Sequence, residues 1–314
     1  MDKLRVLVTT TSFQDTPGKH HDLLAEQNWE VSYLRGPLPA KDLIDIIGHY
    51  DAVICGDDEY NSEVIQKGAK GKLKILSKYG VGLDKIDLEA AQEYSVKVTN
   101  CPGINQNSVA EHVFALLLSF AKNIHTQYRS VQQYSWERQI GHEVLGKTIG
   151  IIGFGAIGRE VARIAQAFKQ SVLVYDPYVE NETIKRYPST EKVKVLSELF
   201  ARADYISLHT PLTSKTKHLI SQDVIENQLA KKPIIINTAR AGLVETEAII
   251  QGIKNDKISG YLCDVLEEEP ITTNEKLVGL ENVIITPHVG SRTHENVENQ
   301  GTMSIKNTVD FLKN

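Results

Sequence analysis

A histidine and an arginine in the second half of the chain each follow a predicted strand. His288 comes after "NVIIT", and Arg240 comes after "PIIIN". Histidine titrates near neutral pH, so it can give or take the proton that accompanies hydride transfer at a carbinol carbon. Arginine presents a planar, permanently charged fork that holds a carboxylate through two hydrogen bonds. Together the two side chains indicate oxidation or reduction of a small hydroxy or oxo acid.

A carboxylate near the histidine would stabilise its protonated form and fix its orientation. The run "LEEEP" supplies Glu267, Glu268 and Glu269, and the sequence positions do not choose among them. Taken singly, these side chains also have ordinary interpretations as a solvated turn, a surface ion pair or a packed histidine. His112 and the other remaining histidines are interpreted in that way. The other residues at predicted strand ends, where ligands bind in open α/β sheets, are Thr210, Pro211, Thr238, Ala239 and Asp264.

A glycine-rich turn precedes these residues. Gly153, Gly155 and Gly158 match G-x-G-x-x-G between the apolar strand "TIGII" and the amphipathic helix "REVARIAQAF". The first glycine allows a tight turn and the second lets a pyrophosphate approach. The third lets the helix pack on its strand, which leaves phosphate at the helix N-terminus. The alternative, a glycine turn in an ordinary α/β unit, is disfavoured by this context.

An acidic residue ends the next predicted strand. Asp176 lies eighteen residues after Gly158, where a carboxylate binds a ribose 2′-hydroxyl. A carboxylate there would repel a 2′-phosphate. The sequence therefore predicts NAD, not NADP, as the cofactor, and the turn residues Ala156 and Ile157 belong to the predicted site.

Short β-branched runs alternate with helical patterns along the whole chain, which is typical of α/β proteins with parallel sheets. The strand candidates "RVLVTT", "EVSYL", "AVICG", "KILSKYG" and "VKVTN" form a small unit before the glycine turn. The last helix, Thr293 to Leu312, has no following strand, so we expect it to cross back and pack on the first domain. Two crossings would give a hinged pair of domains with a cleft between them.

The segment after the first unit predicts a buried helix and an arm. Ser108 with Glu111 has the spacing of a capping box, and the helix that follows is apolar on nearly every side. With Tyr134 and Trp136, this region carries more hydrophobic surface than one domain pair needs. Residues 108–142 are therefore expected to form an interface between subunits, so an oligomer is predicted.

The composition excludes several classes of protein. The chain has 314 residues, 41% of them hydrophobic, and a formal net charge of −5. No basic stripe indicates a nucleic-acid or membrane surface. Cys55, Cys101 and Cys263 suggest neither a disulfide framework nor a metal site. The N-terminus lacks signal-peptide anatomy and the longest apolar run is too short to span a membrane, so a cytoplasmic protein is expected.

The sequence resembles the D-isomer-specific 2-hydroxyacid dehydrogenase family, most closely its phosphoglycerate dehydrogenase-like branch. The resemblance covers nearly the whole chain and rests on seven motifs in family order. They are "SKYGVGLDKIDLEAA", "NCPGINQNSVAEH", "GKTIGIIGFGAIGREVA", "SLHTPLTSKTKHLI", "INTARAGLVE", "LCDVLEEEP" and "ENVIITPHVGS".

The resemblance implies two Rossmann-like, doubly wound parallel-sheet domains and a homodimer built from residues 108–142. A discontinuous substrate domain would comprise residues 1–101 and 288–314, and an NAD-binding domain residues 102–287. Arg240 would bind the substrate carboxylate, His288 would be the acid/base, and Glu269 would pair with His288. Cofactor contacts are implied for Val81, Asp264, His288 and Gly290, with Asp264 facing the nicotinamide carboxamide. Substrate contacts are implied for Lys78, Tyr79, Gly80, Val81 and Gly82, whose loop amides would bind the carboxylate.

The substrate stays open at this point. Motif similarity favours the 3-phosphoglycerate/3-phosphohydroxypyruvate pair, and hydroxypyruvate, glyoxylate or another D-2-hydroxyacid is the alternative. Phosphoglycerate enzymes tend to present first-domain arginines, but here Lys78 and Gly56 stand where these often lie. Asp57, Asp58 and Glu59 would disfavour a phosphate only if they face the cleft. Remote alternatives are an NAD-sensing, non-enzymatic corepressor and an enzyme acting on formate or phosphite.

Overall fold

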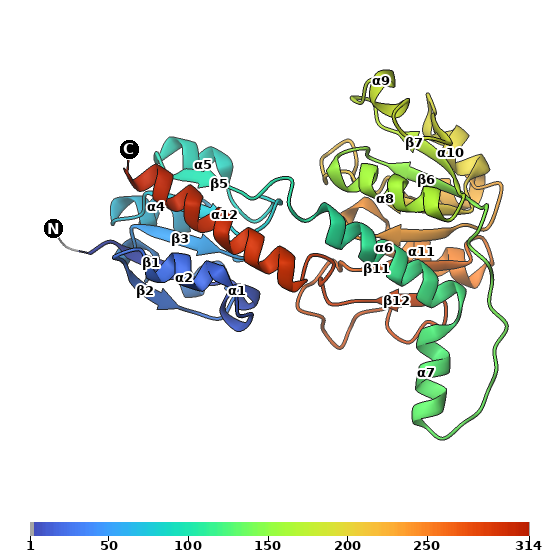
Figure 1. Cartoon of the computed structure of the whole chain (residues 1–314), viewed down its shortest axis with the longest axis horizontal. Helices are drawn as coiled ribbons and strands as arrows, with labels where there is room; N and C mark the ends of the chain where they lie inside the picture. The colour runs from blue at the N-terminus through green and yellow to red at the C-terminus, as the bar shows by residue number, and fades with distance from the viewer. Residues whose placement is uncertain (1–2, 314) are drawn as a thin grey trace. The chain divides into compact units, whose positions relative to one another are not determined.

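The chain folds into two compact α/β units, which are seen in a computed structural model that describes residues 3–313 (Figure 1). Unit 1 comprises residues 1–105 and 292–314, and unit 2 comprises residues 106–291. Each unit contains a parallel sheet with helices on both faces, which confirms the predicted fold class. Each boundary lies four residues later than expected. His288 therefore belongs to unit 2, and the amides of Val289 and Gly290 in its turn donate to Asp264 of the same unit.

Unit 1 contains a five-stranded sheet in the order β2-β1-β3-β4-β5. The strands are β1 Arg5–Val8, β2 Glu30–Tyr33, β3 Ala52–Cys55, β4 Ile75–Lys78 and β5 Lys97–Thr99. The central strands are buried along nearly their whole length, which explains their continuous apolar runs. All neighbouring strands are parallel, so their carboxyl ends lie at one edge of the sheet.

Helices cover both faces of this sheet. They are α1 Thr11–Asp15, α2 Lys19–Ala25, α3 Ala40–Leu43, α4 Ser62–Lys70, α5 Leu88–Glu93 and α12 His294–Lys313, with the 3₁₀ turn η1 Ile47–His49. Alternate strand residues face opposite sides: Val6 packs in a cluster with Phe13, whereas Leu7 packs in a cluster with Val64. The long C-terminal helix α12 contributes Ile305, which is fully buried, to the first of these clusters.

Unit 2 contains a seven-stranded parallel sheet in the order β12-β11-β10-β9-β6-β7-β8. The strands are β6 Thr148–Ile152, β7 Ser171–Tyr175, β8 Thr190–Lys192, β9 Tyr205–Leu208, β10 Ile234–Asn237, β11 Gly260–Cys263 and β12 Val283–Ile285. The strand order reverses at β6, which lies between β7 and β9. This is the arrangement of the Rossmann sheet, whose ligand site lies at the carboxyl edge beside the reversal.

The helices of unit 2 are α6 Gln106–Ala121, α7 Ile124–Gln132, α8 Ala156–Ala167, α9 Asn181–Ile184, α10 Leu196–Arg202 and α11 Thr246–Lys254. The π turn η2 Val224–Gln228 and the 3₁₀ turn η3 Ala241–Leu243 complete the unit. Helix α6 packs against α8 and buries Val113 and Leu117. Because α6 begins at Gln106, Ser108 lies inside the helix, and the capping-box prediction is wrong.

Helix α7 differs from every other long helix of unit 2 because it buries none of its residues. It leads into an extended segment that stands away from the sheet (Figure 1). Tyr134 is fully exposed, and Trp136 and Ile140 are 80% and 94% exposed. Within residues 3–313, these three apolar side chains therefore contribute little to packing.

Candidate active site

The carboxyl edge of the unit 2 sheet brings together residues from six strands. The glycine turn follows β6, Asp176 follows β7, and Thr210 follows β9. Arg240 follows β10, Asp264 follows β11, and His288 follows β12. Because all seven strands are parallel, these residues share one edge although they are spread over 136 positions of sequence. The sheet, and no single motif, assembles the site.

The glycine turn has the backbone geometry that its sequence predicts. Gly153 has φ +95°, a conformation that favours glycine, and a side chain there would collide with the backbone of His209. A side chain at Gly158 would strike the carbonyl oxygen of Gly153. Helix α8 begins at Ala156, directly after Gly155. The first turn of α8 therefore presents unpaired amides and the positive end of its dipole, which suit a phosphate.

Asp176 is tied to the glycine turn itself. Its carboxylate accepts hydrogen bonds from the amide of Phe154 at 2.8 Å and from the amide of Tyr178 at 2.8 Å. The first of these bonds fixes the acid beside the turn, and the second fixes the loop that follows β7. The residue predicted to discriminate between nucleotides is thus positioned by the backbone of the phosphate-binding turn.

His288 and Glu269 form a hydrogen-bonded pair. His288 Nδ1 lies 2.7 Å from Glu269 Oε2, and both side chains are a little over one-third exposed. The other two glutamates have different partners: Glu267 accepts from Thr246, and Glu268 from Thr272. An ionised carboxylate can only accept, so Nδ1 is the donor and Nε2 is the nitrogen suited to proton exchange with a ligand.

The turn that carries Arg240 is held by a buried asparagine that the sequence interpretation missed. Asn237, the last residue of β10, is fully buried. Its side-chain nitrogen donates to the carbonyl of Arg240 at 2.9 Å, and its oxygen accepts from the amide of Ala239 at 3.1 Å. The guanidinium donates to the carbonyl of Ala239 at 2.7 Å. An asparagine at a strand end followed by a tight turn was the available signal, since its side chain commonly caps such turns.

Asp264 holds the turn that carries His288. Its carboxylate accepts from the Thr286 hydroxyl at 2.6 Å, from the Val289 amide at 2.9 Å and from the Gly290 amide at 2.7 Å. His288 itself has φ +52°, an uncommon conformation for a non-glycine residue. A side chain at Gly290 would crowd the carboxylate at 2.9 Å. Asp264 is 2% exposed, so its carboxylate is held by hydrogen bonds from the protein and is nearly inaccessible to solvent.

His112 completes this cluster from helix α6. Its Nε2 lies 2.8 Å from the Thr286 hydroxyl and 3.4 Å from Asp264 Oδ1. Burial works to raise the pKa of Asp264, but hydrogen bonds from His112, Thr286 and two backbone amides outweigh it and lower the pKa. The interpretation of His112 as an ordinary packed histidine therefore missed its contact with the residues that hold His288.

The residues of unit 2 fit a bound dinucleotide on two observations. A side chain built at Gly155 would meet no atom within 4 Å, so the turn is open on the side where a pyrophosphate would approach. The hydroxyl of Thr238, after β10, is buried and has no hydrogen-bond partner among the described residues. An unpaired buried hydroxyl at this edge is suited to a ligand that can supply a partner.

Two other predicted cofactor residues follow β9. Thr210 and Pro211 come directly after His209, whose imidazole contacts the Ser207 hydroxyl at 2.8 Å. Burial lowers the pKa of His209 to about 3, so this histidine is neutral at physiological pH. The Pro211 carbonyl accepts from the Thr216 hydroxyl at 2.7 Å. These contacts keep the segment after β9 ordered next to the glycine turn.

The predicted substrate residues Lys78 to Gly82 belong to unit 1. Gly80 has φ +133°, and its carbonyl accepts from the amide of Cys101. Val81 is 40% exposed, and the Asn100 side chain donates to its carbonyl at 2.8 Å. The Tyr79 hydroxyl lies 3.4 Å from that of Ser12, and burial raises its pKa to about 12. The Tyr79 phenol is therefore engaged within unit 1, and only the backbone of this residue remains for the carboxylate contact that the sequence predicts.

Three further observations concern residues 3–313. Within this range no cluster of three or more histidine, cysteine, aspartate or glutamate residues has a geometry that would hold a metal ion. No helix in the same range has the length and apolar character needed to cross a membrane. The three cysteines are buried free thiols.

The strand order, the glycine turn and its acidic partner define a dinucleotide-binding protein of the Rossmann type. Comparison with known proteins gives the family. Residues 114–290 match the family described as D-isomer specific 2-hydroxyacid dehydrogenase, NAD binding domain. The chain belongs to this family.

Individual relatives cover most of the chain. D-3-phosphoglycerate dehydrogenase of Methanocaldococcus jannaschii is 38% identical over 96% of this chain, but the chain spans only 56% of that relative's length. Hydroxypyruvate reductase of Thermotoga maritima is 38% identical over 82% of this chain and 83% of its own. The crystal structure of a Thermus thermophilus protein superimposes with a TM-score of 0.87 at 33% identity, covering 99% of this chain and 97% of that one.

Proposed function

We propose that the protein is an NAD-dependent D-2-hydroxyacid dehydrogenase that interconverts a small 2-hydroxy acid and its 2-oxo acid. The observation that carries this proposal is the 2.7 Å contact between His288 and Glu269, at the same sheet edge as the Arg240 turn and the glycine turn. Family membership supports the same reaction class.

The chemistry needs three functions from the protein. When bound, the nicotinamide supplies the hydride in reduction or accepts it in oxidation. Arg240 pairs with the substrate carboxylate and so orients the oxygen on C2. His288 donates a proton from Nε2 to that oxygen in reduction and removes it in oxidation. Glu269 holds the imidazole through Nδ1, so that Nε2 faces the substrate.

The cofactor is proposed to be NAD because of Asp176. A carboxylate beside the glycine turn accepts hydrogen bonds from a ribose 2′-hydroxyl and repels a 2′-phosphate. Hydrogen bonds from the backbone amides of Phe154 and Tyr178 hold the carboxylate in place. The carboxylate therefore cannot move aside to admit a phosphate without losing both hydrogen bonds.

The active protein is proposed to be a homodimer formed through the arm after α7. Tyr134, Trp136 and Ile140 are at least 80% exposed and lie within seven residues of one another. Aromatic side chains gathered on a projecting segment are typical of a protein interface. A second copy of the chain is the partner that supplies a matching surface by symmetry.

The names of the relatives divide between two kinds of substrate. Several relatives are named D-3-phosphoglycerate dehydrogenase, whereas others are named hydroxypyruvate reductase and glyoxylate reductase. Motif similarity favours the phosphorylated substrate, and the unphosphorylated acids are the alternative. The charges at the edge of unit 1 bear on this choice and are considered in the next subsection.

The experiment that tests the proposal is NADH consumption with a panel of 2-oxo acids. The panel contains 3-phosphohydroxypyruvate, hydroxypyruvate, glyoxylate, pyruvate and 2-oxoglutarate, and His288→Ala is the control. We expect turnover of at least one acid and its loss in the variant, while NADH binding is retained. No turnover of any acid by a protein that binds NADH would contradict the proposal and favour the NAD-sensing alternative.

A further inference from the structure

Unit 1 has its own ligand edge, defined by strand order. In the order β2-β1-β3-β4-β5 the chain reverses direction between β1 and β3. In open α/β sheets, ligands bind outside the carboxyl ends of the strands at such a reversal. Here those ends are Thr9 and Thr10 after β1 and Gly56 to Asp58 after β3. A ligand of unit 1 would therefore meet these two segments first.

Lys78 directs its ammonium group to this point. It is the last residue of β4, and its side chain is only 6% exposed. Nζ donates to the carbonyl of Gly56 and to Asp57 Oδ1, the latter at 2.6 Å. Asp57 contrasts with its partner, because its side chain is 61% exposed. The ammonium group of Lys78 is thus buried, whereas the carboxylate that neutralises it is exposed to solvent.

The next acidic residue, Asp58, adds a carboxylate that is held in a fixed position near Lys78. Asp58 is fully buried and accepts hydrogen bonds from the Thr9 hydroxyl, from the Leu38 amide at 2.9 Å and from the Gly56 amide at 3.2 Å. These bonds fasten the segment after β3 to the segment after β1. Glu59, by contrast, is exposed and accepts from the amide of Ala40. The predicted acidic edge therefore contains a paired, a buried and a solvent-facing carboxylate.

We propose that Asp57 determines substrate specificity by occupying Lys78. The edge then favours a 2-oxo acid whose far end is uncharged, such as hydroxypyruvate or glyoxylate. A phosphate monoester would have to displace Asp57 from the ammonium group, and the displaced carboxylate and Asp58 would both repel its negative charges. The inference rests on the proposed dehydrogenase function, because specificity is read from turnover.

The test compares two acids that differ only in the phosphate. kcat/KM for hydroxypyruvate and for 3-phosphohydroxypyruvate is measured with NADH for the wild-type chain and for Asp57→Asn. We expect the wild type to prefer hydroxypyruvate at least tenfold. Asp57→Asn should shift the ratio at least tenfold toward the phosphorylated acid, mainly through a lower KM, because Lys78 is released from its counter-ion.

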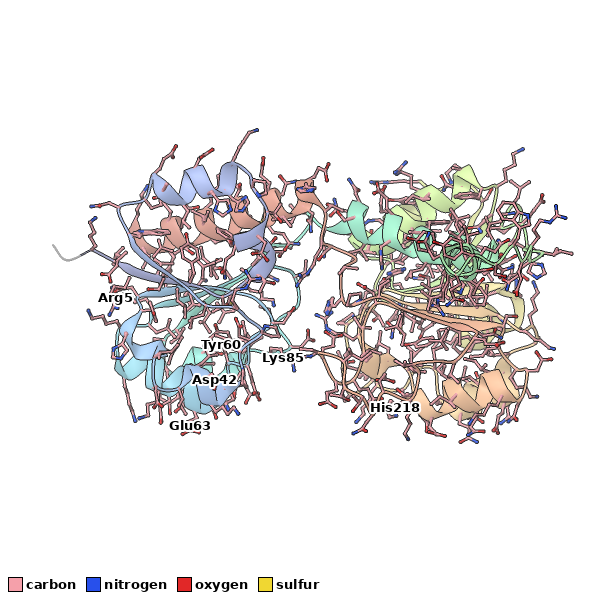
Figure 2. The ribbon with its side chains drawn as sticks, turned by 90° about the horizontal axis from the view of Figure 1, so that it is seen from below. Arg5, Asp42, Tyr60, Glu63, Lys85 and His218 are labelled. Carbon is pink, nitrogen blue, oxygen red and sulfur yellow. The ribbon has the colours of Figure 1, made fainter. Side chains whose placement is uncertain are left out.

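Glu63→Gln is the matched control. Glu63 lies on α4 of the same unit, is exposed to solvent and points outward from the helix (Figure 2). The Glu63→Gln variant removes the same single negative charge as Asp57→Asn but leaves the Lys78 contact intact. Its ratio of kcat/KM for the two acids should therefore stay within twofold of the wild-type ratio. Repeating the assays at high salt separates a local contact from a long-range field, because only the latter is strongly screened.

The outcomes separate the two proposals. Turnover of both acids with an unchanged ratio in Asp57→Asn, or a wild-type preference for the phosphorylated acid, would overturn the role of Asp57 and leave the dehydrogenase function intact. An equal shift in Glu63→Gln would also overturn it, since net charge would then suffice. If the wild type reduces none of the acids in the panel, the proposed function is overturned, and this inference is overturned with it.

Discussion

The hydrogen bonds to Asp264 lead to a quantitative prediction for Asp264→Asn. Its two carboxylate oxygens accept from the amides of Val289 and Gly290 and from the Thr286 hydroxyl, all within 2.9 Å. In either orientation, an asparagine amide places an NH₂ group against one of the two backbone N–H groups. A buried donor left without an acceptor costs about 1–3 kcal/mol.

The cost of this unsatisfied N–H group is similar to the free energy needed to hold His288 in its left-handed backbone conformation. His288 is held at φ +52°, and a left-handed conformation costs a non-glycine residue about 1–2 kcal/mol. Asp264→Asn therefore removes much of the free energy that keeps His288 in its turn. Since about 1.4 kcal/mol corresponds to a tenfold change in rate, kcat should fall about 5- to 150-fold.

The assay measures kcat and KM for the best 2-oxo acid, together with the Kd for NADH from fluorescence. Asp256→Asn is the control, because Asp256 is an exposed residue that pairs with Lys232; it should match the wild type. A kcat for Asp264→Asn within twofold of the wild type would refute the positioning role. A weaker Kd for NADH with unchanged kcat would instead support the expected contact between Asp264 and the nicotinamide carboxamide.

Three further predictions concern the cofactor, the arm and a buried histidine. Asp176→Ser should lower the ratio of kcat/KM with NADH to that with NADPH at least about tenfold, since about 1.4 kcal/mol of discrimination is tenfold; an unchanged ratio would disprove discrimination by this acid. Tyr134→Ser combined with Trp136→Ser should convert a dimer into a monomer in analytical ultracentrifugation, whereas a variant that remains dimeric would place the interface elsewhere. Burial lowers the pKa of His20, so the unfolded chain binds this proton first and stability falls as pH drops below about 6.5. In urea unfolding His20→Gln should show a smaller loss over that range, and an equal loss would assign the pH effect to other groups.

The parts of the fold that follow from local physics could be predicted from the sequence. The glycine turn is one example, because the φ of Gly153 and the close approach at Gly158 are demands that only glycine meets. The buried central strands are another, since parallel strands covered on both faces have continuous apolar runs. The short strand β8 was missed, because "TEK" is a polar, three-residue strand at the edge of the sheet and has no such run.

The arrangement within the site depends on contacts that sequence spacing does not reveal. Three adjacent glutamates are equivalent in the sequence, and only the path of the chain after β11 brings Glu269, and not its neighbours, to His288. His112 and Thr286 are 174 residues apart, yet they lie within hydrogen-bond distance because α6 packs beside the carboxyl ends of β11 and β12. Residue types at strand ends therefore predict which chemistry is available, whereas buried polar partners decide how each group is held. For this reason a substitution at His112, which is not predicted to touch substrate or cofactor, should lower kcat, because His112 contacts Thr286 and Asp264, which hold the turn of the proposed acid/base His288.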